Sequence, residues 1–413
     1  MRRLEIWASP EPTIVRLDND RVRDQTEETG HCERDDDIER LAALKVCGSR
    51  YPVLWESVRP LRDVEGDYAW SRRRIDALQS HGIEPIITLL HHGSGPRYTN
   101  LVDDAFPELF AEYAEATARR FPEVRRWTPI NEPLTTARFS TVYGVWYPNL
   151  RDNCAFARAM VNQARAILLA FARIRSVIPT AELLLTEDLQ SYRAANRAAI
   201  DYVEYKRERS RLSLDLLCGN VRPGHALWTH LVDDCAIAPS ALEQIRRLAR
   251  PPDLMGWNYY PNSERFVTSE PSSPGHDNVA LVDVAPELLN PRQLLRDAWR
   301  RFRIPMALSE VHVYGSESER VRWLLQRYDD VVALRSEGVD IRALGAWAAF
   351  GMIDWNSLLQ TRAGCAEDGI YTCGAPARPP EPTAVADALR SLSSGVRPNA
   401  NPLPGWWERR RSA

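Results

Sequence analysis

The chain has 413 residues, which is enough for two or three domains or for a single α/β barrel with long loops. Charged residues make up 26% and hydrophobic residues 44%, a composition that excludes collagen-like, low-complexity and wholly disordered proteins. The formal net charge of −3 creates no field of one sign, so we expect no nucleic acid partner and no attraction to an anionic membrane.

The N-terminal segment and the cysteines bear on where the protein resides. The chain starts with Met1, Arg2 and Arg3 like a signal peptide, but Glu5 and Pro10 interrupt the apolar run that must follow. The sequence contains no stretch approaching the ~20 apolar residues that span a bilayer. Its seven cysteines show no CxxC or other metal-binding spacing. We therefore expect reduced thiols, a cytoplasmic location and no membrane partner.

Short apolar runs rich in β-branched or aromatic residues recur along the chain, and helical patterns separate them. The sequence predicts strands at Leu4–Trp7, Arg50–Trp55, Pro85–His91, Arg126–Asn131, Glu182–Glu187, Leu254–Tyr259, Met306–Glu310 and Leu344–Phe350. It predicts helices at Asp36–Lys45, Trp70–Gln79, Glu108–Arg120, Phe156–Ile174, Ala241–Leu248, Gln293–Arg301 and Ser318–Arg335. Near-continuous apolar strands are typical of a parallel sheet covered on both faces, and their alternation with helices indicates βα units. The predicted fold class is therefore α/β, a single (β/α)₈ TIM barrel over residues 1–364 with extended βα loops.

Two insertions and a C-terminal segment interrupt or follow this pattern. We expect extra helices in Ser191–Asp253 and a loop in Thr268–Pro291. Residues 365–413 contain Pro-rich stretches and a basic patch at Arg409–Arg411, and this segment either packs on the barrel or is partly disordered. Whether Trp406 and Trp407 cover the cleft is left open.

Polar and aromatic residues gather where the predicted strands end. These ends carry His91-His92, Asn131-Glu132, Glu187-Asp188, Asn258-Tyr259-Tyr260, Glu310 and Asp354-Trp355. In TIM barrels the catalytic groups lie at the C-terminal ends of the strands, so this face is the predicted site. The alternative is that strand ends are polar only because they emerge into solvent.

The segment Trp127–Pro133 gives the strongest local signal. Pro133 biases Glu132 away from α-helical geometry, so the strand should end there and hold Glu132 at the barrel mouth, with Asn131 beside it. A carboxyl group in a partly desolvated cleft has a raised pKa, as a general acid requires at neutral pH. The alternative role for this Asn-Glu-Pro sequence is a loop cap.

A second glutamate, Glu310, ends a buried strand three strands farther around the ring. Two carboxyls that face each other across one cleft are the apparatus of glycoside hydrolysis. A separation of roughly 5–5.5 Å indicates a nucleophile and retention, whereas roughly 6.5–9.5 Å indicates inversion. The sequence leaves that distance open, and Glu310 alone could equally be a capping or salt-bridged residue.

Aromatic residues near the strand ends suit a sugar ligand, because the C–H faces of pyranose rings stack on aromatic rings. The candidates are Trp257, Tyr259, Tyr260, Trp347 and Trp355, although core packing is an alternative for each one. Adjacent residues on a strand point to opposite faces, so the pair His91-His92 predicts no metal site. We find no Gly-rich phosphate loop, GxSxG elbow or Walker motif, and we expect no cofactor.

On these motifs the chain resembles glycoside hydrolase family 1, the β-glucosidase type with catalytic glutamates on strands four and seven. Gly82–His91 is similar to the third-strand motif, which ends in a sugar-binding His, and Leu254–Tyr260, with Asn258, is similar to the sixth-strand motif. The resemblance implies Glu132 as acid/base, Glu310 as nucleophile, and Arg50 and Tyr260 as the residues that hold the nucleophile. It implies sugar contacts from Asn131, His91, Asn258, Trp347, Asp354 and Trp355.

The sequence departs from the family pattern at four places around the sugar. Val311-His312 follows the nucleophile where Asn-Gly is usual, His92 replaces a Trp, Asp354 replaces a Glu, and Glu11 lies near the place of a Gln. We expect His92 and Glu11 to bind the substrate from these positions. These departures suggest an outlying branch that acts on deoxy, amino or otherwise modified sugars, or on glycosides of small natural products.

The resemblance leads us to expect a retaining β-glycosidase whose partner is a small-molecule glycoside. A transglycosidase and a sugar-binding barrel without turnover are the alternatives. The sugar, the aglycone, the oligomeric state and the role of Glu187 are left open.

Overall fold

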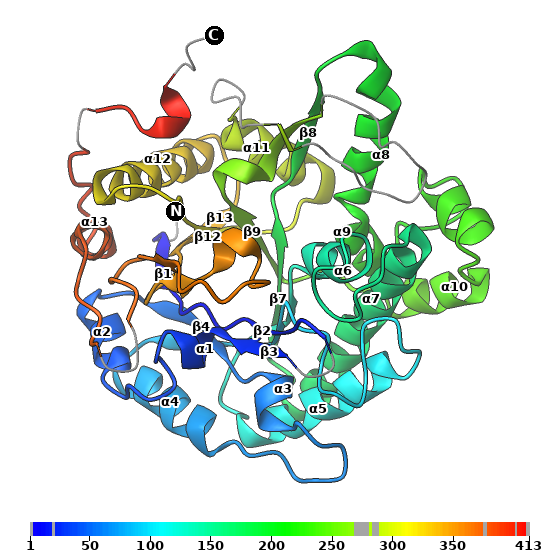
Figure 1. Cartoon of the computed structure of the whole chain (residues 1–413), viewed down its shortest axis with the longest axis horizontal. Helices are drawn as coiled ribbons and strands as arrows, with labels where there is room; N and C mark the ends of the chain where they lie inside the picture. Colours follow the sequence, from blue (N-terminus) through cyan, green and yellow to red (C-terminus); the bar gives the residue numbers. More distant parts are fainter. Residues whose placement is uncertain are drawn as a thin grey trace.

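Eight parallel strands close into a barrel in the order β1-β13-β12-β9-β7-β6-β5-β4, with helices around it (Figure 1). The computed structural model describes residues 3–18, 21–267, 281–282, 289–374, 378–400 and 403–409. The barrel strands are β1 (Glu5–Ala8), β4 (Gly48–Pro52), β5 (Glu84–His91), β6 (Arg126–Asn131), β7 (Glu182–Asp188), β9 (Leu254–Tyr259), β12 (Met306–Val311) and β13 (Ile341–Ala346). The predicted (β/α)₈ fold class is therefore confirmed.

The outer layer contains all seven predicted helices, with ends that differ by a few residues. They are α2 (Asp37–Ala43), α4 (Ala69–Ser80), α5 (Phe106–Arg120), α7 (Asn153–Val177), α10 (Pro239–Leu248), α11 (Pro291–Phe302) and α12 (Glu317–Ser336). An unpredicted helix, α13 (Ala384–Ser393), packs against α12 and β1. It lies after residue 364, so the C-terminal segment contributes a helix to the outer layer.

Two predicted strands have wrong bounds. Trp55 lies in the short helix α3 (Trp55–Val58) rather than at the end of a strand, and β4 begins earlier, at Gly48. A Cβ atom on Gly48 would lie 2.8 Å from the ring of Trp7, so only glycine allows β1 and β4 to meet there. Strand β13 ends at Ala346, so Trp347 lies after the strand and not within it.

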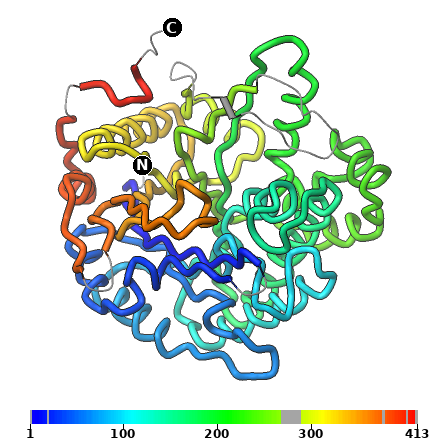
Figure 2. Tube along the Cα trace, viewed as in Figure 1, coloured from blue at the N-terminus to red at the C-terminus, as the bar shows by residue number. Residues whose placement is uncertain are grey.

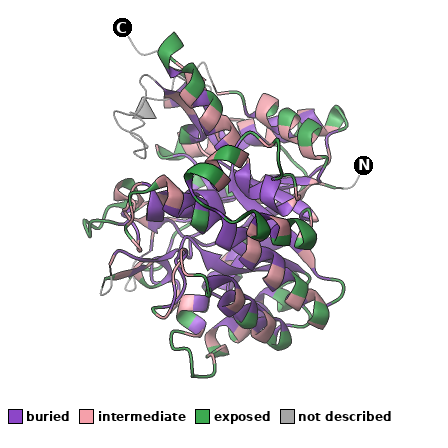
Figure 3. Ribbon diagram, turned by 90° about the vertical axis from the view of Figure 1, so that its right-hand side faces the viewer, coloured by how far each residue is buried: buried purple, intermediate pink, exposed green. Residues whose placement is uncertain are grey.

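The interior of the barrel is filled below the predicted site. Six buried side chains from six strands form one cluster inside the barrel: Trp7, Ile86, Leu184, Leu254, Ala307 and Ala343. A much larger apolar cluster lies between the strands and the outer helices, and Figure 3 shows the buried centre within exposed helix surfaces. The filled layer leaves the C-terminal strand ends as the place for a cavity.

The insertion between β7 and β9 contains helices, as predicted. It includes β8 (Ser191–Ala194), α8 (Ile200–Arg209) and α9 (Leu212–Leu217), followed by α10. Strand β8 pairs with β10 (Glu264–Val267), which also pairs with β11 (Leu281–Val282). The predicted loop Thr268–Pro291 therefore contains a strand and the first residue of α11; residues 268–280 and 283–288 lie outside the described residues.

Several shorter elements border the barrel mouth. These are β2 (Ile14–Arg16), β3 (Val22–Asp24), α1 (Gln25–Glu28), α6 (Pro133–Thr141), β14 (Met352–Ile353) and β15 (Ala366–Glu367). The last described turn, η6 (Trp406–Glu408), lies beside α12 near the C-terminus (Figure 2). Of the basic patch Arg409–Arg411, only Arg409 is among the described residues.

All seven cysteines lie in the described part of the chain and are unpaired. Within the described ranges, the helices include none with the length and apolar character that crossing a membrane requires.

Candidate active site

A cavity of about 340 Å³ opens at the C-terminal ends of the barrel strands. Seven of the twelve predicted site residues line it: Glu11, His92, Glu132, Tyr260, Glu310, Trp347 and Trp355. The structure thus brings both predicted catalytic carboxyls to one cavity. Three other predicted residues, Arg50, Asn131 and Asn258, lie buried directly behind this wall and bond to the lining carboxyls or to one another.

Glu132 lies at the junction of β6 and α6, and only 5% of it is exposed. Its backbone is left-handed, with φ 44° and ψ 63°, rather than the extended conformation that a following proline favours. Its Oε1 accepts a hydrogen bond of 2.7 Å from the Asn258 amide. Burial, followed by the negative charge of Glu310, raises the pKa of Glu132 well above its ordinary value. This carboxyl is therefore suited to hold a proton.

Glu310 lies on β12 and is 2% exposed, but it has stronger donors than Glu132. The guanidinium of Arg50 forms an ion pair with Oε1, and the hydroxyl of Tyr260 donates to Oε2 over 2.5 Å. Burial raises the pKa of Glu310, and the Arg50 charge and the Tyr260 hydrogen bond oppose that rise. The two carboxyls thus differ: a cation and a hydroxyl stabilise an ionised Glu310, whereas a neutral amide contacts Glu132.

Neighbouring strands hold the two carboxyls through shared partners. In the sheet register Glu310 pairs with Asn258, whose Oδ1 accepts from the Ser309 hydroxyl over 2.7 Å while its Nδ2 donates to Glu132. Arg50 donates to Asn131 over 2.8 Å as well as to Glu310. Strands β4, β6, β9 and β12 are therefore joined around one centre.

The histidine pair lies on the opposite side of Asn131 from Arg50. The Asn131 amide nitrogen is 3.3 Å from Nε2 of His91 and 3.4 Å from Nε2 of His92. Burial, followed by the charge of Arg50, lowers the pKa of His92 to about 3, and burial lowers that of His91 well below its usual value. Both rings are therefore neutral at pH 7, and His91 stacks on Trp347 with an interplanar angle of 3°.

Glu11 and the two tryptophans form a polar and aromatic end of the cavity. Oε2 of Glu11 accepts from the Trp347 indole over 3.1 Å, and burial raises the pKa of Glu11 to about 7. The Trp355 indole N–H is buried, with no hydrogen-bond partner among the described residues. A sugar hydroxyl is a suitable acceptor for such an N–H group.

Asp354 does not join the described residues that line the cavity. Its Oδ2 accepts from Arg23 over 3.0 Å, and its Oδ1 accepts from the Cys365 backbone over 2.8 Å. Burial acts to raise its pKa, but the Cys365 N–H and Arg23 lower it overall. The buried ion pair with Arg23 thus holds this carboxylate apart from the cavity lining, and its sugar contact stays a prediction.

Sequence reasoning missed an acidic residue that does line the cavity. Glu367 on β15 contacts His312, with 2.5 Å between Oε1 and Nε2, and both side chains face the cavity. His312 was identified only as a departure from the family pattern. Glu367 gave no signal because it lies beyond the last predicted strand.

Glu187, whose role the sequence left open, lies at the end of β7 behind α6. Its Oε2 accepts from the Leu134 backbone over 3.1 Å, and burial raises its pKa to about 7. It is not among the described residues that line the cavity. Its next neighbour Asp188 does line the cavity and pairs with Arg265.

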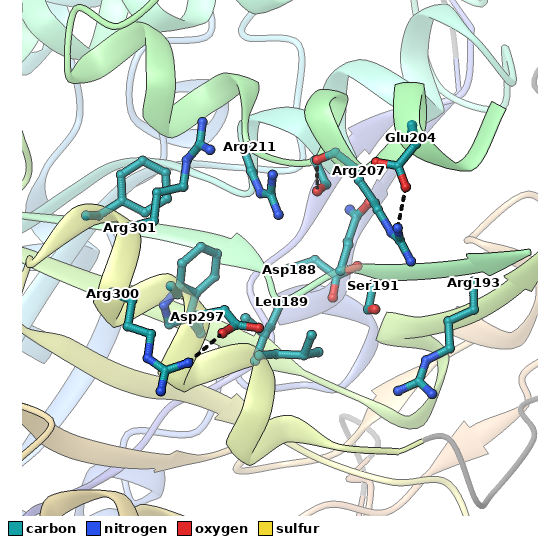
Figure 4. Close-up of a pocket in the computed structure, with 16 residues that line it drawn as sticks. Asp188, Leu189, Ser191, Arg193, Glu204, Arg207, Arg211, Asp297, Arg300 and Arg301 are labelled. Atoms are coloured by element: carbon teal, nitrogen blue, oxygen red, sulfur yellow. Dashed lines mark hydrogen bonds and ion pairs between the residues drawn. The ribbon is translucent and has the colours of Figure 1, made fainter. Parts of the chain in front are cut away.

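A larger cavity of about 860 Å³ shares Asp188 with the first, and Figure 4 shows the residues that line it. Five arginines from β8, α8, α11 and the turn after α8 line it: Arg193, Arg207, Arg211, Arg300 and Arg301. Each one has a carboxylate partner within 4 Å, respectively Glu264, Glu204, Glu208, Asp297 and Asp215. The positive charges are thus balanced, and the cavity between Glu132 and Glu310 is the better candidate for catalysis.

Comparisons with known proteins give the family of this chain. The family model described as Glycosyl hydrolase family 1 matches residues 16–311. Putative beta-glucosidase 17 from Oryza sativa subsp. japonica is 31% identical over 122 residues, which are 28% of this chain and 40% of the rice protein. The matched segment thus spans less than half of that relative. Furcatin hydrolase from Viburnum furcatum is 22% identical over 403 residues, covering 81% of this chain and 72% of that protein.

A solved structure extends the likeness to the whole barrel. The Thermotoga maritima family 1 glycoside hydrolase, complexed with a cyclophellitol analogue transition state mimic, superposes with a TM-score of 0.77. It is 16% identical and covers 95% of this chain and 97% of its own, so this likeness shows the fold. Because the family model spans more than half of the sequence, from Arg16 to Val311, the chain belongs to glycosyl hydrolase family 1.

Proposed function

We propose that the protein is a retaining β-glycosidase that hydrolyses a small-molecule β-O-glycoside. One observation carries the proposal: two buried carboxyls line the same cavity, one with a cation and a hydroxyl as donors and the other with an amide. Family membership supports the reaction class. The departures around the sugar favour a modified sugar or a natural-product glycoside as substrate.

In the proposed mechanism, the ionised Oε of Glu310 attacks the anomeric carbon as the bond to the leaving oxygen breaks. Glu132 gives its proton to that oxygen, which releases the aglycone as an alcohol. The deprotonated Glu132 then takes a proton from water, and the resulting oxygen nucleophile displaces Glu310 from the sugar. Arg50 and Tyr260 hold Glu310 in its charged form and fix its orientation.

Two experiments test the role of Glu310: its replacement, and trapping of the glycosyl–enzyme intermediate in the wild-type protein. We expect Glu310→Gly to lose nearly all turnover of a 2,4-dinitrophenyl β-glycoside, whereas Glu39→Gln, on the exposed surface of α2, keeps it. A 2-deoxy-2-fluoro glycoside should add the mass of the fluorosugar to the peptide that contains Glu310. Undiminished turnover by Glu310→Gly, or label on another residue, would refute the assignment.

Product analysis separates the alternatives. Sugar passed to an added alcohol in preference to water would indicate a transglycosidase. Calorimetric binding of glycosides without turnover over a broad panel would indicate a sugar-binding barrel.

A further inference from the structure

The C-terminal tail delivers an aromatic side chain to the cavity. Trp406, in η6, is among the residues that line it, although the family match ends at residue 311. Its indole N–H donates to the Tyr314 carbonyl over 2.8 Å, and its backbone N–H donates to Glu319 over 3.0 Å. The position of Trp406 is therefore set by contacts with the loop after β12 and with α12.

The next residues of the tail anchor this turn. Trp407 is buried, packs edge-on against Trp323 with ring centroids 5.0 Å apart, and donates to Gln326 over 3.1 Å. Glu408 forms an ion pair with Arg322. These contacts hold η6 on α12, and Trp406 therefore borders the cavity from a segment that is packed against the barrel's outer layer.

The exposure of the lining side chains distinguishes the floor of the cavity from its mouth. The carboxyls of Glu132 and Glu310 are almost fully buried, whereas Tyr314, which also lines the cavity, is 70% exposed. Trp406 is half-buried and bonds to the backbone of Tyr314. The two aromatic residues thus form one rim above the carboxyls, on the side of the loop that follows Glu310.

We propose that Trp406, together with Tyr314, forms the platform for the aglycone, and that the natural aglycone is a planar aromatic group. The inference rests on the proposed glycosidase function. A sugar whose anomeric carbon lies between the carboxyls is surrounded by Glu11, Trp347 and Trp355, so its leaving group extends toward the mouth. An aromatic ring of the aglycone at the cavity mouth stacks on the indole and removes apolar area from water. A methyl group is too small to stack in this way.

The test compares benzyl and methyl β-glycosides of the sugar that the wild-type enzyme hydrolyses fastest, because both leaving groups are simple alcohols. We expect Trp406→Ala to lower kcat/KM for the benzyl glycoside roughly tenfold and to change that for the methyl glycoside less than about twofold. Trp406→Phe should retain most of the preference for benzyl. Trp299→Ala, which removes a half-buried Trp from the outer helix α11, is the matched control.

A second variant guards against loss of folding. Tyr314→Ala changes an exposed side chain and should reduce the benzyl preference in the same direction by a smaller factor. The inference would be overturned if, in both Trp406→Ala and Tyr314→Ala, kcat/KM fell equally for the two glycosides or did not fall for either. Such a result would leave the glycosidase assignment intact.

A binding measurement makes the inference independent of turnover. If the wild-type enzyme hydrolyses no glycoside in the panel, the proposed function fails. Calorimetry with the benzyl and methyl β-glycosides of the sugar that the wild-type protein binds most tightly then decides the role of Trp406. Tighter binding of the benzyl compound that is lost in Trp406→Ala supports the inference, and equal affinities reject it.

Discussion

Nε2 of His312 lies 2.5 Å from Oε1 of Glu367, and both side chains form part of the cavity wall, with His312 two residues after Glu310 in the chain. The loop after β12 supplies the histidine, and β15 supplies the acid. The pair therefore places a polar contact at a position where the family pattern has Asn-Gly, and it connects two segments that border the proposed sugar site.

Replacing the acid of this pair should weaken substrate binding. Glu367→Gln removes the charge but keeps the shape, so we expect KM to rise about tenfold while kcat changes less than about twofold, because a wall contact exists before and during the reaction. Steady-state kinetics check this, with the exposed Glu381→Gln as control. A loss confined to kcat would instead place Glu367 in the chemical step.

The pH dependence of kcat/KM should be bell-shaped, with Glu310 ionised and Glu132 protonated in the active form. Activity should fall as pH drops through the pKa of Glu310 and as pH rises through the raised pKa of Glu132. Glu132→Gln should lose the alkaline limb and about 10²–10⁴-fold in rate on an unactivated glycoside. Added azide should restore turnover of a 2,4-dinitrophenyl glycoside by this variant; an unchanged alkaline limb would exclude Glu132 as the acid.

Tyr260→Phe tests how Glu310 is kept ionised. The hydroxyl donates to Oε2 and lowers the pKa of Glu310, so its removal should move the acid limb to higher pH. A hydrogen bond to a charged group contributes about 1.5–3 kcal/mol, so kcat/KM should fall by roughly 10–150-fold. If kcat/KM falls but the acid limb does not move, Tyr260 acts on the sugar rather than on Glu310.

Asp354 should matter for stability rather than for sugar binding. Asp354→Asn leaves the buried Arg23 with Glu28 as its one remaining charged partner among the described residues, and breaking a buried ion pair costs about 3 kcal/mol. We expect a lower free energy of unfolding in urea and a KM within about twofold of wild type. A large rise in KM at unchanged stability would mean that Asp354 turns toward the substrate.

Glu187 should make the protein less stable at high pH. Its pKa is raised from 4.5 to about 7 by burial, so the folded state holds more protons than the unfolded state between these values. The free energy of unfolding should therefore fall as pH rises from about 4.5 to about 7. Glu187→Gln should remove up to about 3 kcal/mol of this fall, as measured by urea unfolding at pH 5 and pH 8. Glu39→Gln, on the surface, should show the wild-type dependence.

Some features were predictable because they depend on local pattern. The apolar run Pro85–His91 and its neighbours predict strands, and their alternation with helices predicts the barrel. Closure of the barrel then brings strand ends to one face, so Glu132 and Glu310 could be assigned to one cavity. The helix α13 was missed, although Thr383 caps it and Val385, Ala388, Leu389 and Leu392 follow a helical spacing, because Pro-rich stretches surround it.

The amino-acid sequence by itself determined the order of strands and helices, because the spacing of apolar residues along a short segment decides which of the two it forms. Only the tertiary structure decided which polar side chains enter the cavity. Asp354 turns away because Arg23, distant in sequence, holds it, while Glu367 enters because β15 pairs with β14. Trp406 reaches the rim through contacts with α12. Such pairings depend on the approach of segments that are far apart in the chain, which local periodicity does not encode.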